Sequence, residues 1–503
     1  MVAPDLRKYQ IDFIERFECE VLRGRQSLLG VAPTGSGKTV VAAAVARHAL
    51  SQGKRVLFMV HRRELVRQSS QKLYDVGLDH GIIAAGFPTR PAEPVQIASI
   101  STLDARAVRS SSLQLPPADL VIVDEAHHAP ARTWRRLIGA YPEAVVLGQT
   151  ATPCRGDGRG LGDIFETMIE CASIPALIND GYLVPTRVYA PTQPDLADVK
   201  VRRGDYVEAE LAERMDRPQL VGDVVTHWHR PGERRRTIVF ATSVAHSIHL
   251  RDEFGRSGVA AAHVDGTTPA AERDAVLAGL ASGAFEVVTN CGVLTEGFDL
   301  PDIGVIVLAR PTKSLGLYRQ MVGRGLRPAT GKSHCLVMDH AGCTFEHGFI
   351  DEPIEWTLAP DKRPRQPAQT GRASRGARTL VECPECSAVR WEGQPCPVCN
   401  WRPHTKPKDV EVIDGELGLL TRDGAVENAI TTADKNLFHG QLLWIARERG
   451  YKPGWAAYKY KEKFGAWPRR NHVEPIAPLQ ATWSWVRSKQ IAYAKAMQKA
   501  GAP

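Results

Sequence analysis

The sequence has no apolar run long enough to cross a membrane. Hydrophobic residues make up 43% of its 503 residues, but none of its stretches approaches the roughly 20 consecutive apolar residues that a membrane-spanning helix needs. The first residues, MVAPDLRKYQIDF, contain no apolar core of the kind that a secretory signal peptide carries. We therefore expect a cytoplasmic protein without a membrane partner.

Cysteine is sparse through most of the chain. Six of the cysteines stand alone, at Cys19, Cys154, Cys171, Cys291, Cys335 and Cys343. In a reducing compartment such thiols stay unpaired, and we interpret these as core or inert residues.

The remaining cysteines are clustered in the segment CPECSAVRWEGQPCPVC, as Cys383, Cys386, Cys396 and Cys399. Two C-x2-C pairs can hold one tetrahedral ion, and thiolates favour Zn²⁺. The pattern predicts a zinc ribbon over 381–404, whose stability the metal would supply. Disulfides or a redox pair are the alternatives. Trp391 and Trp401 flank the cysteine pairs, either to cover the metal site or to stack on bases.

Positive charge is concentrated near the C-terminal end. The net charge is +8, and the excess of lysine and arginine lies in 361–380 and 433–503. Such a surface attracts a polyanion, although a merely solvated tail has the same composition. The stretch 361–379 is also rich in proline, glycine and serine, which predicts a flexible basic linker.

The segment APTGSGKT (32–39) has the pattern of a phosphate-binding loop. A strand-like run, SLLGV, precedes it and a helix-like run, VVAAAVARHAL, follows it. Its glycines let backbone N–H groups converge on phosphate oxygens, Lys38 can reach the β- and γ-phosphates, and the Thr39 hydroxyl can ligate Mg²⁺. The predicted nucleotide contacts are Thr34, Gly35, Ser36, Gly37, Lys38 and Thr39. The alternative is a glycine-rich turn with a surface lysine.

A second motif supplies carboxylates. In DLVIVDEAHH (119–128) a buried strand ends at Asp124 and Glu125, and ligands collect at the carboxyl ends of parallel strands. We expect Asp124 to hold Mg²⁺ and Glu125 to activate the attacking water. A solvated acidic pair is the alternative. Together the two motifs predict a site that binds a nucleoside triphosphate with Mg²⁺ and hydrolyses it.

The second half of the chain repeats the alternation of strands and helices. TIVFA (237–241), EVVTN (286–290) and IGVIVLA (303–309) are strand-like, which predicts a second parallel α/β domain without its own phosphate loop. Arg324 and Arg327 could reach from this domain to the γ-phosphate of a nucleotide bound to the first. Surface salt bridges are the alternative role for these arginines.

The order of these motifs resembles the DEAD/DEAH-type superfamily 2 helicases. The segments that carry the resemblance, besides the two motifs above, are LRKYQ (6–10), MVHRRELVRQ (59–68), ASISTL (98–103), GQTATP (148–153), TIVFATSV (237–244), NCGVLTEGFDLP (290–301) and QMVGRGLRP (320–328). The resemblance implies that Gln10 reads adenine, that Thr150 and Thr152 link hydrolysis to strand binding, and that Gly297 and Asp299 line the nucleotide site. It implies a catalytic role for Gln320, Arg324 and Arg327.

The implied fold class is α/β. We expect two tandem RecA-like parallel-sheet domains followed by a zinc ribbon and a small, basic, mainly helical C-terminal domain. The expected limits are 1–185 for the first domain, 186–215 for a connector, 216–358 for the second domain, 359–380 for the basic linker, 381–404 for the ribbon, 405–432 for a further linker and 433–503 for the C-terminal domain.

The C-terminal segment LLWIARERGYKPGWAAYKYKEKFGAWPRRN (442–471) interleaves aromatic residues with lysines. Such a pattern suits a platform for single-stranded nucleic acid, on which bases stack. It equally suits short helices that bury their aromatic residues and solvate their lysines, and the two roles can coexist.

Taken with the ribbon, this segment makes the chain similar to the RadD family of bacterial DNA-repair ATPases and its phage relatives. The resemblance implies a helicase that uses ATP on single-stranded or branched DNA, with a recombinase or a single-strand binding protein as partner. An RNA-dependent ATPase, an accessory ATPase that does not unwind, and the motor of a restriction nuclease are the alternatives. The sequence has no RRM or KH signature, which favours DNA over RNA, and no clear nuclease carboxylate–lysine cluster.

Overall fold

The computed structural model describes residues 6–110, 112–190, 194–202, 204–229, 234–297, 299–364, 379–403, 419–420, 426–427, 432–452, 454–468 and 473–499. The chain divides into two compact units, Met1–His404 and Thr405–Pro503. Most of the expected basic linker and most of the expected linker over 405–432 lie outside the described residues. In the part of the chain that is described, no helix is both long and apolar enough to span a bilayer.

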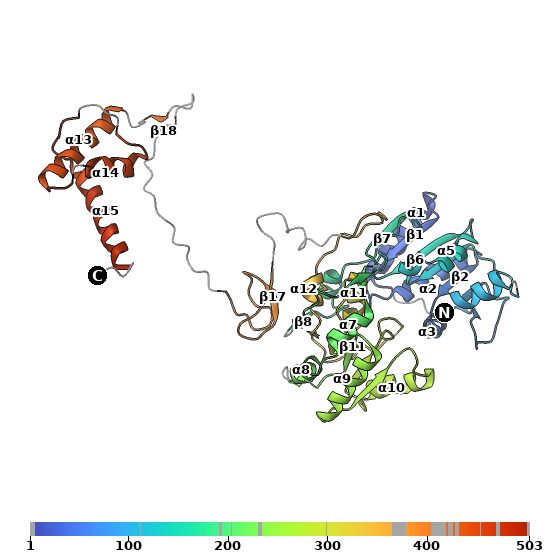
Figure 1. Ribbon diagram of the computed structural model, residues 1–503. Coiled ribbons are helices and arrows are strands. Elements are labelled where there is room, and N and C mark those ends of the chain that lie inside the picture. The colour runs from blue at the N-terminus through green and yellow to red at the C-terminus, as the bar shows by residue number, and fades with distance from the viewer. Residues whose placement is uncertain are drawn as a thin grey trace. The chain divides into compact units, whose positions relative to one another are not determined.

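The first α/β domain is built on a seven-stranded sheet of order β3-β4-β2-β5-β6-β1-β7. Figure 1 labels β1, β2, β6 and β7 of this sheet among the helices α1, α2, α3 and α5. Every neighbouring pair of its strands is parallel. The strands are β1 (Ser27–Val31), β2 (Val56–Val60), β3 (Gly81–Ile83), β4 (Val95–Ser99), β5 (Leu120–Asp124), β6 (Val145–Thr150) and β7 (Thr167–Glu170). The helices are α1 (Lys8–Leu22), α2 (Lys38–Ser51), α3 (Arg63–Asp75), α4 (Ile100–Leu103) and α5 (Arg132–Gly139), with short turns at Asp104–Arg109 and Ala126–His128.

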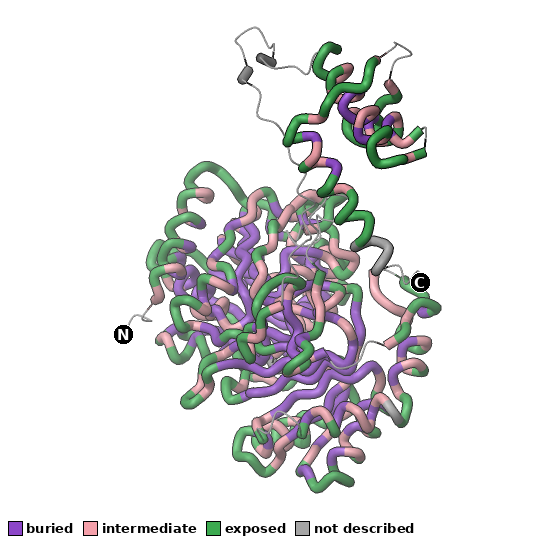
Figure 2. The backbone as a smooth tube through the Cα atoms, turned by 90° about the vertical axis from the view of Figure 1, so that its left-hand side faces the viewer, coloured by how far each residue is buried: buried purple, intermediate pink, exposed green. Residues whose placement is uncertain are grey.

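The central strands of this sheet are buried on both faces. All residues of β2 and β5 are buried, as expected for parallel strands covered by helices on both sides. One apolar cluster includes Phe13 of α1 and Val45 of α2, and a second, on the other face, includes Leu137 of α5. Figure 2 shows buried residues gathered in the interior of the α/β part and exposed residues towards its outside.

The second α/β domain contains a six-stranded parallel sheet of order β12-β13-β11-β14-β15-β8. Its strands are β8 (Thr186–Tyr189), β11 (Thr237–Ala241), β12 (Ala261–Val264), β13 (Val287–Asn290), β14 (Val305–Ala309) and β15 (Cys335–Asp339). Its helices are α6 (Ile174–Asn179), α8 (Pro218–His229), α9 (Val244–Arg256), α10 (Ala270–Ser282), α11 (Leu315–Gly323) and α12 (Cys343–His347). The second parallel α/β domain is therefore present as the sequence predicts.

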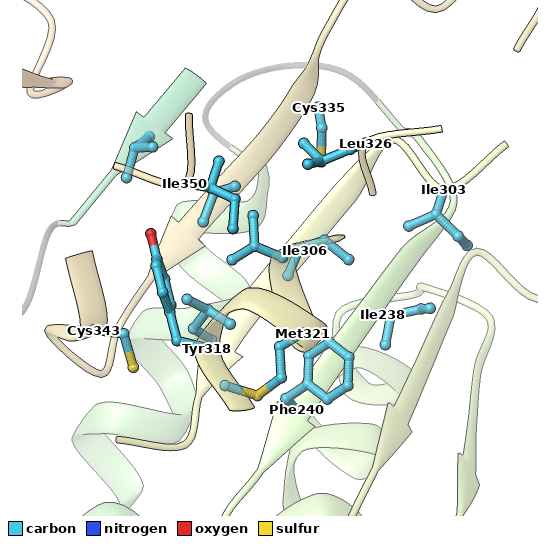
Figure 3. Packing of buried hydrophobic residues seen from close by; sticks show 14 of the residues in the cluster. Ile238, Phe240, Ile303, Ile306, Tyr318, Met321, Leu326, Cys335, Cys343 and Ile350 are labelled. Atoms are coloured by element: carbon cyan, nitrogen blue, oxygen red, sulfur yellow. The ribbon is translucent and has the colours of Figure 1, made fainter. Parts of the chain in front are cut away.

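The core of this domain forms where α11 packs onto the sheet (Figure 3). Phe240 of β11, Ile306 of β14 and Met321 of α11 are buried there. Tyr318 is fully buried, and its hydroxyl donates a hydrogen bond to the Gly348 carbonyl at 3.0 Å. This bond satisfies the polar end of a large buried side chain, so α11 is held in one orientation.

The boundary between the two domains differs from the expected one. Residues 186–189, expected in a connector, form β8 and pair with β15 at the edge of the second sheet. Leu177, Leu183 and Val184 also belong to the second core. Only Val188 of β8 is buried, so the sequence TRVY lacks the apolar run that reveals a central strand. The described remainder of the expected connector contains β9 (Val201–Arg202), which pairs with β10 (Asp205–Tyr206), and α7 (Glu208–Met215).

After the second sheet the chain returns to the first domain. The backbone N–H groups of Gly160 and Gly162 donate to the carbonyls of Ala359 and Leu358, at 3.2 and 2.6 Å. The side chains of Trp356 and Leu358 pack against the α5 side of the first core. We call residues 356–359 the return strap. The expected second domain, which ended at 358, therefore closes with a segment that packs on the first.

The cysteine-containing segment packs on the second domain. Its hairpin pairs β16 (Leu380–Glu382) with β17 (Val389–Trp391), and Ala388 forms an antiparallel bridge with Tyr189 of β8. Val389 joins the core of the second domain, and the Trp391 ring meets Phe349 edge-to-face at 5.9 Å. The segment therefore covers the edge strand β8.

Among its described residues, the second unit contains the helices α13 (Thr432–Glu448), α14 (Trp455–Phe464) and α15 (Gln480–Lys499), and a short pairing of β18 (Leu419–Leu420) with β19 (Val426–Glu427). Its core consists of Leu442, Ile445, Ala456, Tyr460 and Val486. All three helices contribute to this core.

The return strap gives a test of the fold. A Cβ atom at Gly162 would lie 2.5 Å from the Leu358 carbonyl oxygen, so Gly162→Ala must displace the strap. We expect a loss of about 1–3 kcal/mol in stability, measured as a lower midpoint of thermal unfolding by circular dichroism. Gly156→Ala is the control, because nothing lies within 4 Å of its Cβ position. Equal midpoints for the two variants would contradict the packing of the strap.

Candidate functional site

The loop between β1 and α2 has the geometry of an anion-binding turn. Gly35 and Gly37 have φ angles of +88° and +83°, which side chains with a Cβ rarely adopt. A Cβ at Gly37 would also lie 2.6 Å from Nε2 of Gln10. The loop ends where α2 begins at Lys38, so the N–H groups of the first helical turn are available to phosphate oxygens.

The two carboxylates stand at the end of β5. Glu125 has a φ of +49°, an uncommon backbone conformation for a non-glycine residue, which is often found at functional sites. Its backbone N–H donates to Oδ1 of Asp124 at 3.0 Å. Burial and the neighbouring Glu125 raise the pKa of Asp124. Burial alone would raise the pKa of Glu125 too, but Lys38 and His127 outweigh it and hold that pKa below its usual value.

A cavity of about 430 Å³ brings most of the predicted site residues together. From the first domain it is lined by Thr34, Gly35, Gly37, Lys38, Thr39, Asp124 and Glu125. From the second domain it is lined by Gly297, Asp299, Arg324 and Arg327. We call it the interdomain cavity. Its donors fit a nucleotide with Mg²⁺, because the Thr39 hydroxyl and the Asp124 carboxylate are the oxygen ligands that Mg²⁺ prefers.

Gln10 and Ser36 support the loop and do not line the cavity. The Gln10 side chain accepts from the Arg7 backbone N–H at 3.0 Å and donates to the Ser36 carbonyl at 3.1 Å. Arg7 and Tyr182 line the cavity in its place, with the guanidinium 4.1 Å from the centre of the tyrosine ring. Tyr182 lies far from every motif in the sequence, so no pattern there marked it.

The arginines of the second domain lie against the loop of the first. Arg327 forms an ion pair with Asp299 at 2.7 Å, and a Cβ at Gly35 would lie 3.2 Å from Arg327 Cγ. Arg324 donates to the Thr295 carbonyl at 2.6 and 3.0 Å. Burial lowers the pKa of Arg324 to about 10, so it remains charged at neutral pH.

Sequence reasoning missed Glu296, which lies at the contact between the two domains. Its side chain is only 6% exposed. One carboxylate oxygen lies 2.9 Å from Nε2 of His61, and the other lies 3.4 Å from Nε2 of both His127 and His128. We call these four residues the His–Glu joint. The sequence places the three histidines in two motifs of one domain, but it carries no signal that pairs them with Glu296.

His127 connects this joint to the predicted catalytic carboxylate. Its Nδ1 lies 3.4 Å from Glu125 Oε2 and 3.1 Å from the Thr150 hydroxyl, and its Nε2 lies 3.4 Å from Nε2 of Gln320. Burial lowers the pKa of His127, but Glu125 and Glu296 outweigh this and raise it to about 9. At neutral pH the imidazole is therefore protonated between two carboxylates, one from each domain.

Further contacts join the motifs of the two domains. Gln68 donates to the Gly297 carbonyl at 2.8 Å, and Arg62 donates to the Val293 carbonyl at 3.4 Å. A Cβ at Gly323 of α11 would lie 2.9 Å from Cβ of Thr34, so α11 lies directly on the phosphate loop. The Thr150 hydroxyl accepts from the Thr152 N–H at 3.1 Å, which fixes the turn after β6.

The four clustered cysteines form a separate group with metal-ligand geometry. Their sulfur atoms lie within 4.8 Å of one another, with 3.7 Å between Cys383 and Cys399 and 3.6 Å between Cys386 and Cys396. None is in a disulfide. A tetrahedral ion bound at about 2.3 Å holds its sulfurs about 3.8 Å apart, so the set fits Zn²⁺. Trp401 packs against this group.

The chain matches known proteins along most of its length. Residues 3–155 match the family model "Type III restriction enzyme, res subunit", and residues 219–329 match the "Helicase conserved C-terminal domain". Over 398 residues it is 31% identical to a 51.5 kDa protein of Lactococcus phage (isolate 7-9), covering 78% of this chain and 82% of that protein. It is 31% identical over 371 residues to the putative ATP-dependent helicase IRC3 of Saccharomyces cerevisiae, covering 70% of this chain and 53% of the yeast protein.

Solved structures share the fold. A fragment of a putative HsdR subunit of a type I restriction enzyme from Vibrio vulnificus YJ016 has a TM-score of 0.56 at 24% identity, over 71% of this chain and 67% of that chain. The Type ISP restriction-modification enzyme LlaBIII bound to DNA has a TM-score of 0.51 at 19% identity, over 66% of this chain and 27% of that chain.

The chain belongs to the superfamily 2 helicases. It is therefore a nucleic-acid-dependent ATPase, related to type I restriction enzymes and the Irc3 helicases, and its two α/β domains are the RecA-like domains of that superfamily. The chain spans about half the length of the yeast relative.

The His–Glu joint gives a prediction about pH. Glu296→Gln keeps the shape of the side chain and removes its charge, so the pKa of His127 falls from about 9. A raised pKa means that the ion pair is fully formed below about pH 6.5 and is lost as pH rises through the folded value. We expect stimulated ATP turnover to fall about tenfold or more and the alkaline limb of its pH profile to move to lower pH.

The control for this variant is Glu272→Gln, which changes an exposed glutamate at the start of α10. Steady-state turnover from pH 6 to 10, with and without nucleic acid, is the measurement. An unchanged alkaline limb in Glu296→Gln would show that the carboxylate does not hold the proton on His127.

The cysteine group gives a prediction about metal. Cys396→Ser removes one of four thiolates from a buried position, so the purified protein should contain less than one zinc per chain by elemental analysis. Cys335→Ser, at a buried cysteine outside the group, is the control and should leave the zinc content unchanged. Equal zinc in both variants would exclude this ligand set.

Proposed function

We propose that the chain is an ATP-dependent DNA helicase or translocase that acts on single-stranded or branched DNA in repair, recombination or replication. The observation that carries this proposal is the interdomain cavity, whose predicted phosphate, metal and arginine contacts come from two separate domains. A site divided in this way is complete only when the domains meet. Nucleotide binding and hydrolysis would thus be coupled to domain closure and opening.

Each side chain has a proposed role in hydrolysis. Lys38 and the loop N–H groups would hold the β- and γ-phosphates, and Thr39 and Asp124 would hold Mg²⁺, which neutralises phosphate charge. Glu125 would orient the attacking water, and Arg324 and Arg327 would stabilise charge on the transferred phosphoryl group. Gln320 would act through His127, whose imidazole it approaches.

The His–Glu joint supports a link between strand binding and hydrolysis. Glu296 and Gly297 belong to NCGVLTEGFDLP (290–301), one of the segments that carry the helicase resemblance, and Gln68 of the first domain donates to the Gly297 carbonyl. A strand that moves this segment would move Glu296 and, through His127, the environment of Glu125. The rate of ATP hydrolysis would then depend on whether a nucleic-acid strand is bound.

DNA is the proposed polymer. The matching family model and the HsdR fragment are named for restriction enzymes, and the LlaBIII structure is bound to DNA. An RNA-dependent ATPase and an accessory ATPase that does not unwind would use the same core, and the test below distinguishes them.

Three further proposals concern the rest of the chain. We propose that zinc binds at Cys383, Cys386, Cys396 and Cys399. We propose that the first domain ends before α6, and that a recombinase or a single-strand binding protein is the partner.

The deciding measurement is ATP turnover by the full chain alone and with single-stranded DNA, forked DNA or RNA, each at several salt concentrations. We expect strong stimulation by DNA, more by forks than by single strands, and little by RNA. Lys38→Ala should abolish turnover, and Glu125→Gln should retain bound ATP with little turnover, whereas Lys54→Ala, an exposed control, should behave normally. Greater stimulation by RNA would replace DNA in the proposal, and turnover retained by Lys38→Ala would overturn the site.

A further inference from the structure

The aromatic residues of the second unit fall into two sets. Tyr460 is buried in the core. The residues that pack around that core include Phe438, Trp444, Tyr451, Trp455, Phe464, Trp483 and Trp485. These side chains explain most of the aromatic pattern that the sequence shows, because they hold three short helices together.

Three aromatic residues of the described part of the unit do not join that core, and two of them, Tyr458 and Trp467, contact each other. Tyr458 is 67% exposed and Trp467 is 50% exposed. Their rings contact each other edge-to-face, with centroids 5.0 Å apart and planes at 75°. We call them the Tyr458–Trp467 pair. Exposing two large rings to water is less favourable than burying them, and the packing of the unit does not explain why they are exposed.

The local sequence builds this pair. Ala456 and Tyr460, four residues apart on α14, face the core, whereas Tyr458 and Lys461, three residues apart, share another face. Gly465 has a φ of +72° and ends the helix, its N–H donating to the Lys461 carbonyl at 2.8 Å. The chain therefore turns back, and Trp467 lies beside α14.

A cation completes the pair. Nζ of Lys461 lies 4.5 Å from the centre of the Trp467 ring. Its neighbour Lys459 is paired with Glu462 at 2.6 Å, but within the described part of the second unit no carboxylate forms an ion pair with Lys461. Lys461 is thus held beside the rings with its charge uncompensated by an acidic side chain.

We propose that the Tyr458–Trp467 pair and Lys461 bind single-stranded nucleic acid, with unpaired bases stacked on the rings and a backbone phosphate at Lys461. The inference rests on the proposed function, because it assumes that the chain works on a strand. Stacking on exposed rings requires free base faces, which a duplex buries in its own stack. The unit also carries a clear excess of lysine and arginine over acidic residues, which favours a polyanion.

This contact lies in a different unit from the ATPase core. A second contact on the same strand raises the effective concentration of DNA at the core without changing the chemistry there. Loss of the pair should therefore raise the DNA concentration needed for half-maximal stimulation and leave the maximal turnover rate unchanged. If the pair instead helps the unit to fold, its substitution would lower both the midpoint of thermal unfolding and the maximal turnover rate.

The experiment uses the full chain and a fluorescein-labelled oligothymidylate of about 20 nucleotides, measured by anisotropy. Tyr458→Ala and Trp467→Ala should each raise Kd about 5- to 100-fold, and Trp467→Phe should restore most of the affinity. Lys461→Ala should reduce the dependence of log Kd on log salt by about 0.7, the value of one phosphate contact on a single strand. Tyr493→Ala is the control, because Tyr493 is equally exposed, at 67%, on α15.

The outcomes are separable. The inference would be overturned if the wild type is stimulated normally and both alanine variants keep the Kd and the half-maximal DNA concentration of the wild type. The proposed function would then still stand. Absence of stimulation in the wild type would remove the proposed function itself. Displacement of the labelled strand by poly-glutamate as readily as by unlabelled oligothymidylate would overturn the inference, because it would identify a site for acidic polypeptides. A lowered unfolding midpoint in Trp467→Phe would show a packing role instead.

Discussion

The buried carboxylate of Glu296 is the interaction on which the contact between the two RecA-like domains depends. It lies 2.9–3.4 Å from three imidazoles of the other domain and 3.6 Å from Nε of Arg62, so positive charge accompanies it into the interior. The Arg62 guanidinium supplies part of that charge, and His127, whose pKa is raised, supplies the rest. The same imidazole contacts Glu125, and the state of the domain contact is therefore transmitted directly to the carboxylate beside the phosphate loop. Loss of the proton on His127 would leave Arg62 as the remaining cation beside this carboxylate.

The elements that the sequence predicted well are those with strong local signals. The phosphate loop needs glycines at positive φ, and a buried parallel strand needs a continuous apolar run, so APTGSGKT and LVIVDE identify their own conformations. Every central strand that was expected is present, from β1 to β14. The four cysteines likewise carry their spacing in the sequence, and their sulfur atoms converge.

The elements that sequence reasoning missed are those that depend on distant partners. β8 has one buried residue and is a strand only because β15 and the cysteine segment flank it. Gln10 supports the phosphate loop, because its amide accepts from the Arg7 N–H and donates to the Ser36 carbonyl. Tyr182 and Glu296 lie more than a hundred residues from the loops that they approach, and no periodicity links positions so far apart. The aromatic residues of the last unit also look alike in the sequence, although most are packed and Tyr458, Trp467 and Tyr493 are exposed.

The return strap has a mechanical consequence. The second RecA-like domain leaves the first near α6 and comes back to it at residues 356–359. A body attached at both ends of its chain cannot swing freely about a single flexible joint. Its easiest motion is rotation about the line through the two attachments, which reduces opening of the interdomain cavity to one angular coordinate. The cysteine segment is fixed to the second domain through β8, so it would rotate together with that domain. Each cycle of ATP binding and hydrolysis would then move the segment along the same path.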